Sequence, residues 1–191
     1  MWQPSRPIVT TAPSEEAVSL EEAKLHLRVD SDEEDTLILS LTSAAREYVE
    51  NATSRRMVTT SLQIEGPHFC SPIWLPGSPL IAVQSVKYLD ANGTQQTLAS
   101  TNYDVVTNVE PGRVQLSSVG NWPVIKWSPI AVQIKYTAGY GAASAVPPTA
   151  KAAIKLLVSH WYTNREAAMN PMAEIPLGAQ ALIDQLKVWQ A

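Results

Sequence analysis

The sequence has few of the features that assign a protein to a common class at sight. Its 191 residues include one cysteine, so no disulfide can form within the chain, which fits a reducing compartment. No run of about 20 apolar residues is present, so we expect no membrane-spanning helix. The first residues lack the basic-then-apolar order of a signal peptide. The net charge of −4 argues against general nucleic-acid binding.

Motifs for catalysis or metal binding are also absent. The sequence has no Gly-x-Ser-x-Gly, no glycine-rich phosphate loop and no His-Glu-x-x-His. His26, His68 and His160 lie in different segments, without further ligands at metal spacing. The acidic residues between 30 and 35 lack the glycine and the spacing of a calcium loop. We therefore predict no enzyme activity, no cofactor and no metal site.

Residues 19–52 predict two consecutive helices. Ser19 followed by Glu22 forms a capping box, and negative charge at residues 32–35 suits the first turn of the second helix. Apolar residues of that second helix recur at helical spacing and predict one buried face: Leu37, Leu41, Ala44, Ala45, Tyr48 and Val49. Arg46 and Glu50 are four residues apart, and we expect them to pair weakly on the solvent side.

The middle of the chain changes to a strand pattern. Thr- and Val-rich segments alternate between residues 57 and 138, separated by turns such as Pro76–Pro79. Asn92-Gly93 is typical of a tight β-hairpin. Residues 130–137 alternate apolar and polar side chains as a half-buried strand does. This region predicts a small antiparallel sandwich.

Helical spacing returns after residue 139, with a helix starting near Pro147-Pro148 and a last helix over residues 178–189. Helices at both ends and strands between them predict an α+β fold, in which a small helical bundle carries an inserted antiparallel β-sandwich-like domain. The predicted parts are an extended N-terminal arm, a helical hairpin, the inserted β domain and C-terminal helices that complete the bundle: residues 1–18, 19–56, 57–138 and 139–191.

Several stretches resemble one known family. They are SLEEAKLHLRVD at residues 19–30 with the following AAREYVE, VPPTAKAAIKLLVSHWYTNREA at residues 146–167, and IPLG at residues 175–178. In combination they resemble the head–tail connector (adaptor) proteins of long-tailed double-stranded DNA phages and of gene transfer agents. The strand-rich middle resembles the longer subgroup of that family.

The resemblance implies a structural virion protein, assembled in the host cytoplasm, at the head–tail junction. Such proteins form a dodecameric ring under the portal protein and extend the DNA channel towards a tail terminator or stopper protein. The chain would then contact copies of itself and lie near DNA, without binding a membrane. The residues expected to bind the portal or a neighbouring copy are Trp2, Ile8, Val9, Leu186 and Trp189. Those expected on the ring or channel face are Asp32, Glu33, Glu34 and Asp35, because carboxylates do not bind the phosphates of DNA passing through the channel.

An alternative stays open. Trp74, Trp122 and Trp127 could form an exposed aromatic surface on the strand-rich middle. The chain would then be a protein- or carbohydrate-binding β module of a tail fibre or baseplate.

Overall fold

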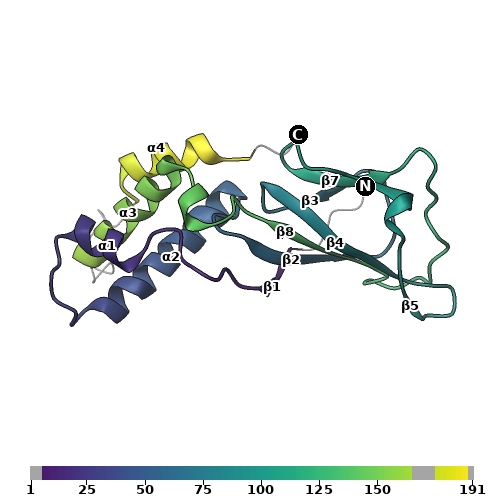
Figure 1. The fold of residues 1–191 in the computed structure, drawn as a ribbon, viewed down its shortest axis with the longest axis horizontal. Helices are drawn as coiled ribbons and strands as arrows, with labels where there is room; N and C mark the ends of the chain where they lie inside the picture. The colour runs from purple at the N-terminus through teal and green to yellow at the C-terminus, as the bar shows by residue number, and fades with distance from the viewer. Residues whose placement is uncertain (1–5, 165–174, 189–191) are drawn as a thin grey trace. The chain divides into compact units, whose positions relative to one another are not determined.

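The computed structural model describes residues 6–164 and 175–188, which form two compact units. We call them the helical unit (residues 14–58, 140–164 and 175–188) and the sheet unit (residues 6–13 and 59–139). The chain therefore passes from one unit to the other after residues 13, 58 and 139. Figure 1 draws the helices and strands of both units as ribbons. No helix among the described residues is long and apolar enough to cross a membrane.

The helical unit contains α1 (Leu20–Leu27), α2 (Asp35–Thr53), α3 (Pro148–Thr163) and α4 (Leu177–Leu186), with a short 3₁₀ turn at Ala143–Ala145. The predicted capping box at the start of α1 is present, with Glu22 N–H donating to Ser19 Oγ and Ser19 N–H donating to Glu22 Oε2. Both α1 and α2 end at a residue in the left-handed conformation, Arg28 and Ser54. The helices enclose a core that includes Ile38, Ile154 and Ile183, all fully buried.

The buried face of α2 differs from the predicted one. Its buried residues are Ile38, Thr42, Ala45, Arg46, Val49, Glu50 and Thr53. Ala44 is exposed, and Leu37, Leu41 and Tyr48 are only partly buried. The prediction that Arg46 and Glu50 lie on the solvent side is therefore wrong. It counted charged side chains as exposed, whereas these two satisfy each other inside the unit.

The sheet unit contains two antiparallel sheets. The larger has the order β1-β2-β8-β4-β5 and the smaller the order β3-β7-β6. The strands of the larger sheet are β1 (Ile8–Thr11), β2 (Thr60–Gly66), β4 (Leu80–Leu89), β5 (Gln95–Thr97) and β8 (Val132–Ala138). Those of the smaller are β3 (Ile73–Leu75), β6 (Tyr103–Val106) and β7 (Gly112–Leu116), with a 3₁₀ turn at Ser100–Asn102 before β6.

The two sheets share one core. In the central β2–β8 pair, Leu62 lies opposite Tyr136 and Ile64 opposite Ile134, and all four side chains are fully buried. The alternate residues of both strands, among them Gln63 and Lys135, lie on the outer face. Ile73, Leu75 and Val114 of the smaller sheet complete the cluster. Two antiparallel sheets over one core, with helices from both chain ends, confirm the predicted α+β fold class.

The hairpin predicted at Asn92-Gly93 joins β4 to β5. Asp90 accepts hydrogen bonds from the backbone N–H groups of Asn92 and Thr94, and Gly93 has φ of +86°. The side-chain amide of Gln96, followed by those backbone donors, holds the pKa of Asp90 below its ordinary value. The hairpin is therefore fixed by a carboxylate as well as by its glycine.

Candidate functional site

The acidic residues predicted to face a ring or channel lie between α1 and α2. Lys24 of α1 reaches two of them, with its Nζ 2.6 Å from Asp32 Oδ1 and 2.8 Å from Asp35 Oδ1. Glu34 accepts a hydrogen bond from the Tyr162 hydroxyl of α3. Asp32 and Glu33 are exposed. The structure thus brings all four carboxylates to one end of the helical unit and ties three of them to neighbouring helices.

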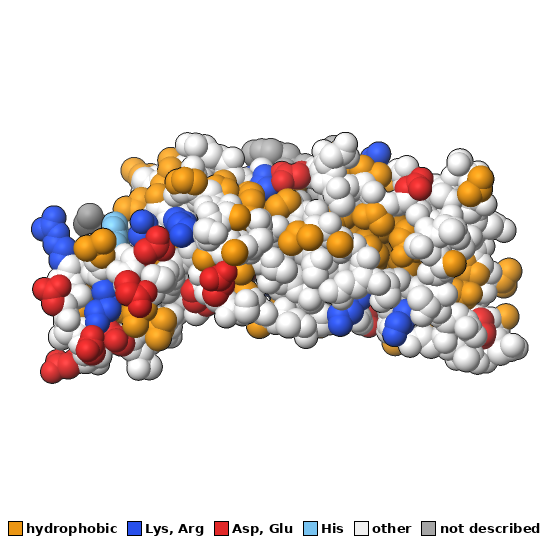
Figure 2. All heavy atoms as spheres, viewed as in Figure 1, with side chains coloured by type: hydrophobic (Ala, Val, Ile, Leu, Met, Phe, Trp, Pro, Cys, Tyr) orange, Lys and Arg blue, Asp and Glu red, His pale blue; other side chains and the backbone are white. Residues whose placement is uncertain are grey.

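The contacts of Lys24 shift the pKa values of the charged groups in this cluster. Hydrogen bonds to Asp32 and Asp35 raise the pKa of Lys24, and the hydrogen bond from Lys24 lowers the pKa of Asp32. The cluster is thus negative but partly compensated. Figure 2 shows acidic side chains gathered over the α1–α2 end of the helical unit. In the described part of the chain, no group of three or more His, Cys, Asp or Glu side chains could hold a metal ion.

The residues predicted to bind a neighbour or the portal fall in different places. Ile8 and Val9 lie together on β1 and are 50% and 47% exposed. Leu186 is in the core of the helical unit and only 9% exposed. Trp2 and Trp189 lie outside the described residues. Ile8 and Val9 therefore lie together on a strand of the sheet unit, whereas Leu186 belongs to the core of the helical unit.

The segment that follows α4 is hydrogen-bonded to residues at the end of α2. Arg55 Nε donates to the Leu186 carbonyl at 2.6 Å, and Val188 N–H donates to the Thr53 carbonyl at 3.0 Å. Arg55 also lies over the Tyr140 ring, 5.8 Å from its centroid. The direction in which the chain leaves α4 is thus set by backbone and cationic contacts, whereas Leu186 contributes packing.

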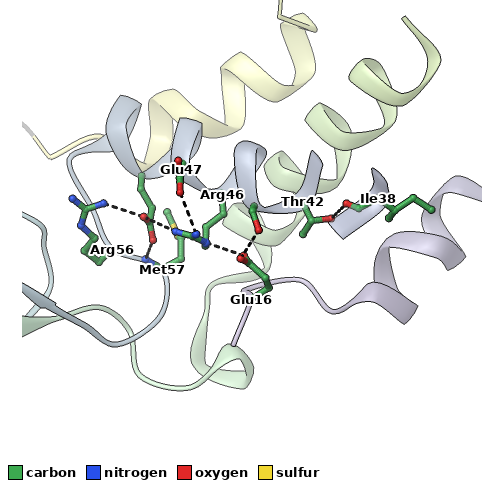
Figure 3. Close-up of polar contacts among 9 residues, drawn as sticks. Glu16, Ile38, Thr42, Arg46, Glu47, Arg56 and Met57 are labelled. Atoms are coloured by element: carbon green, nitrogen blue, oxygen red, sulfur yellow. Dashed lines mark hydrogen bonds and ion pairs between the residues drawn. The ribbon is translucent and has the colours of Figure 1, made fainter. Parts of the chain in front are cut away.

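A buried ion network on α2 was not predicted from the sequence (Figure 3). Arg46 Nε lies 2.8 Å from Glu16 Oε2, and Arg46 Nη1 lies 3.0 Å from Glu50 Oε2. Glu50 also accepts from Arg56 Nη1 at 3.0 Å and from Met57 N–H at 2.9 Å. We call Glu16, Arg46, Glu50 and Arg56 the ion network. Burial opposes the charge on Arg46, but the acceptors Glu16 and Glu50 outweigh it and raise the pKa of Arg46.

The ion network lies where the chain enters and leaves the helical unit. Glu16 belongs to the segment before α1, and Met57 to the segment after α2. The third passage is tied to the same region, since Tyr140 N–H donates to the Met57 carbonyl and Ala143 N–H donates to Glu15 Oε1. The sequence signal for this arrangement is the spacing of Arg46 and Glu50 within an apolar stripe, which by itself predicts a pair on the surface.

The three tryptophans of the alternative interpretation have different environments. Trp122 stacks on Phe69, with ring centroids 4.6 Å apart. Trp74 lies against Arg113, whose guanidinium carbon is 5.2 Å from the ring centroid. Trp127 is 83% exposed, in the segment between β7 and β8 that also exposes Val119 and Val124. Trp127 is thus the most exposed of the three, Trp74 is 40% exposed, and Trp122 is partly buried.

Comparison with known proteins gives a family and a shared fold. Residues 17–110 match the family model of phage gp6-like head-tail connector proteins. No curated protein matches the chain. The match covers α1, α2 and the strands from β2 to β6, and so includes the stretch at residues 19–30 and the following AAREYVE.

Solved structures match over nearly the full length. A chain in the neck of an empty gene transfer agent particle, computed with C6 symmetry, has a TM-score of 0.82 at 23% identity. A chain in the neck of the native particle, computed with C12 symmetry, has a TM-score of 0.81 at 24% identity. Each match covers 98% of this chain and 97% of the other. A third match, to a chain in the virion of the native particle, has a TM-score of 0.80 at 23% identity.

The chain, with its helical unit and its unit of two sheets, thus shares its fold with a protein in the neck of gene transfer agent particles. Residues 17–110 carry the match to the phage gp6-like head–tail connector family. This match confirms the family resemblance predicted from the sequence. The family is defined by a structural role at a head–tail junction and not by a catalytic activity.

Proposed function

We propose that the chain is a head–tail connector that assembles into a dodecameric ring beneath the portal protein. The observation that carries this proposal is the match over 98% of the chain to a protein in a neck computed with C12 symmetry. The family match over residues 17–110 supports the same role independently. In this proposal the ring extends the DNA channel from the portal towards a tail terminator or stopper protein, and it assembles in the host cytoplasm before joining the virion.

The acidic end of the helical unit suits a surface near DNA. Asp32 and Glu33 are exposed, and like charge keeps the phosphates of passing DNA from binding the wall. We propose that Asp32, Glu33, Glu34 and Asp35 face the channel or the ring surface. Exposed apolar residues on β1, Ile8 and Val9, are proposed to contact a neighbouring copy, and Trp2 and the end of the chain at Leu186 and Trp189 to contact the neighbour or the portal.

Electron microscopy of a mixture with the portal protein tests this function. The purified full chain is mixed with portal rings of the same virion, and class averages are inspected for a second ring at one end of the portal. A stacked ring with twelvefold symmetry is the expected result. Portal rings that stay bare at saturating chain overturn the proposal.

One observation favours a second function. Trp127 and Val124, in the segment between β7 and β8, are 83% and 81% exposed. Exposed apolar side chains of this kind suit a protein- or carbohydrate-binding module in another part of a tail. A glycan array and pull-downs with tail proteins, using the full chain and its Trp127→Ser variant, separate the two. Binding that requires Trp127, together with bare portal rings, would favour the module.

A further inference from the structure

The larger sheet ends in two open edges. On one side β1 pairs with β2 only. On the other side β5 covers only the end of β4, pairing with Lys87–Leu89, while the Val86 carbonyl accepts from Leu98 N–H. Among the described residues, no strand pairs with the outer side of residues 80–85 of β4. Each edge therefore presents unpaired backbone groups that another strand can use.

Neither edge carries a charged side chain, although the register of both strands shifts, between Val9 and Thr11 on β1 and at two places within residues 80–85 of β4. Natural edge strands commonly bear charged side chains that disfavour strand addition. β1 reads IVTT, and residues 80–85 read LIAVQS, with no charged residue in either segment. By contrast, β6, at an edge of the smaller sheet, carries Asp104, and β3, at its other edge, is three residues long. The two open edges of the larger sheet are thus the ones suited to pairing.

Exposed β-branched side chains lie on both edges. Ile8 and Val9 of β1 are 50% and 47% exposed although the strand is paired, and Ile81 of β4 is 43% exposed. Val9 lies opposite Leu62 and so points to the core side of the sheet, where a further strand could cover it. Covering such side chains adds cross-strand packing to the backbone hydrogen bonds.

The directions of β1 and β4 also allow the two open edges to pair with each other. Each neighbour in the order β1-β2-β8-β4 is antiparallel, so β1 and β4 run in opposite directions. If the larger sheet of one copy continues into that of the next, β1 of the second copy meets β4 of the first in antiparallel orientation. A ring of identical copies needs two different, mutually complementary surfaces on each copy, and the two edges provide such a pair.

We propose that neighbouring copies of this chain join by antiparallel pairing of β1 with residues 80–85 of β4. The inference rests on the ring proposed above and names the surface that closes it. Pairing joins the larger sheets of successive copies into one continuous ring of strands, in which β1 and residues 80–85 of β4 are no longer open edges. The partner is a second copy of this chain and not the portal.

Substitution of Ile81 by lysine tests the pairing. A lysine at an open edge weakens strand addition, so Ile81→Lys is expected to reduce ring formation on the portal by on the order of tenfold or more. The matched control is Val105→Lys, at a residue 37% exposed on β6, and it is expected to leave ring formation unchanged. Mass photometry and electron microscopy count the rings, and thermal unfolding of each variant checks its fold.

Crosslinking tests the contact without a disruptive charge. With Cys70 replaced by serine, one protein carries Val9→Cys and a differently tagged protein carries Gln84→Cys. A short bismaleimide reagent is expected to link the two tags in assembled rings. Val9→Cys mixed with Val105→Cys is the control and is expected to give no link.

The outcomes separate this inference from the proposed function. If the unmodified chain forms no ring with the portal, both fail. If rings form but the Val9–Gln84 link is absent, the strand pairing is overturned and the ring stands. A link between positions 9 and 105 would likewise overturn it, because the smaller sheet would then make the contact.

Discussion

Arg46 and Glu50 form an ion pair in the interior of the helical unit, with Nη1 and Oε2 3.0 Å apart. The two residues are only 7% and 2% exposed. Because Glu50 also accepts from the Met57 N–H, the pair connects the middle of α2 to the segment that follows it. A pair at ordinary helical spacing therefore determines how the chain leaves the helix.

Removing Glu50 is expected to destabilise the protein strongly. Glu50→Ala deprives Arg46, Arg56 and the Met57 N–H of an acceptor, and breaking a buried pair by removing one partner costs about 3–5 kcal/mol. Urea unfolding measures the change in the free energy of unfolding. Glu47→Ala is the control, since the Glu47 side chain is 66% exposed and should cost no more than about 0.5 kcal/mol. Equal stability of the two variants would show that the ion network does not stabilise the unit.

Lys24→Gln is expected to raise the pKa of Asp32 towards its ordinary value, because the hydrogen bond from Lys24 is the main cause of its depression. A carboxyl with a lowered pKa in the folded state stabilises that state above its ordinary pKa. This contribution is lost as the pH falls through the folded pKa. The melting temperatures of the wild type and the variant should therefore differ at pH 7 and converge in acid, below about pH 4.

Carboxyl NMR titration measures the Asp32 shift directly, and melting curves at several pH values give the convergence. Lys155→Gln on α3 serves as the control and should leave the Asp32 titration as it is in the wild type. An Asp32 pKa that is the same in the wild type and in Lys24→Gln would contradict the contact between Lys24 Nζ and Asp32 Oδ1 at 2.6 Å.

Removing the capping box of α1 is expected to destabilise the protein less than removing Glu50. Ser19→Ala removes the acceptor of Glu22 N–H and should cost about 1 kcal/mol of stability. Ser40→Ala, at an exposed position within α2, should be neutral or slightly stabilising because alanine favours helix. Chemical unfolding of the two variants gives the comparison. A loss at Ser40 as large as that at Ser19 would mean that the cap has no special role.

Two glycines should respond in opposite directions to alanine. A Cβ at Gly112 would lie 2.5 Å from Leu80 Cβ, and Leu80 is 6% exposed and has little room to move. Gly112→Ala should therefore cost roughly 1–3 kcal/mol. At Gly178, in α4, the nearest atom would be 3.9 Å away, so Gly178→Ala should gain about 0.4–1 kcal/mol. Differential scanning calorimetry would show the lower and the higher melting temperature.

Local patterns in the sequence predicted what local physics determines. The capping box at Ser19, the hairpin at Asn92-Gly93 and the alternation of Ile134 and Tyr136 each follow from neighbouring residues, and the structure confirms them. The buried face of α2 was predicted wrongly because Glu16, 30 residues before Arg46, supplies part of the charge compensation. Periodicity within α2 carries no information about that partner.

The sequence predicts which residues of the candidate surfaces are exposed, but not how distant segments come together to form them. An acidic helix start indicated exposed carboxylates, and Asp32 and Glu33 are exposed. That Lys24 lies between Asp32 and Asp35 depends on how α1 packs on α2. The two open sheet edges depend on strand order, which brings β1 beside β2 and places β8 between β2 and β4. Such pairings between distant segments leave no mark in a single sequence.

The place of β8 at the centre of the larger sheet bears on the order of events during translation. β1 and β2 leave the ribosome first, but their inner neighbour, Val132–Ala138, is made after every other strand. Leu62 and Ile64 thus have no partner strand on that side while most of the sheet is being synthesised. Nascent chains that stop before residue 138 would expose an unprotected strand edge and depend on chaperones, whereas release of the complete chain allows the sheet to close in one cooperative step.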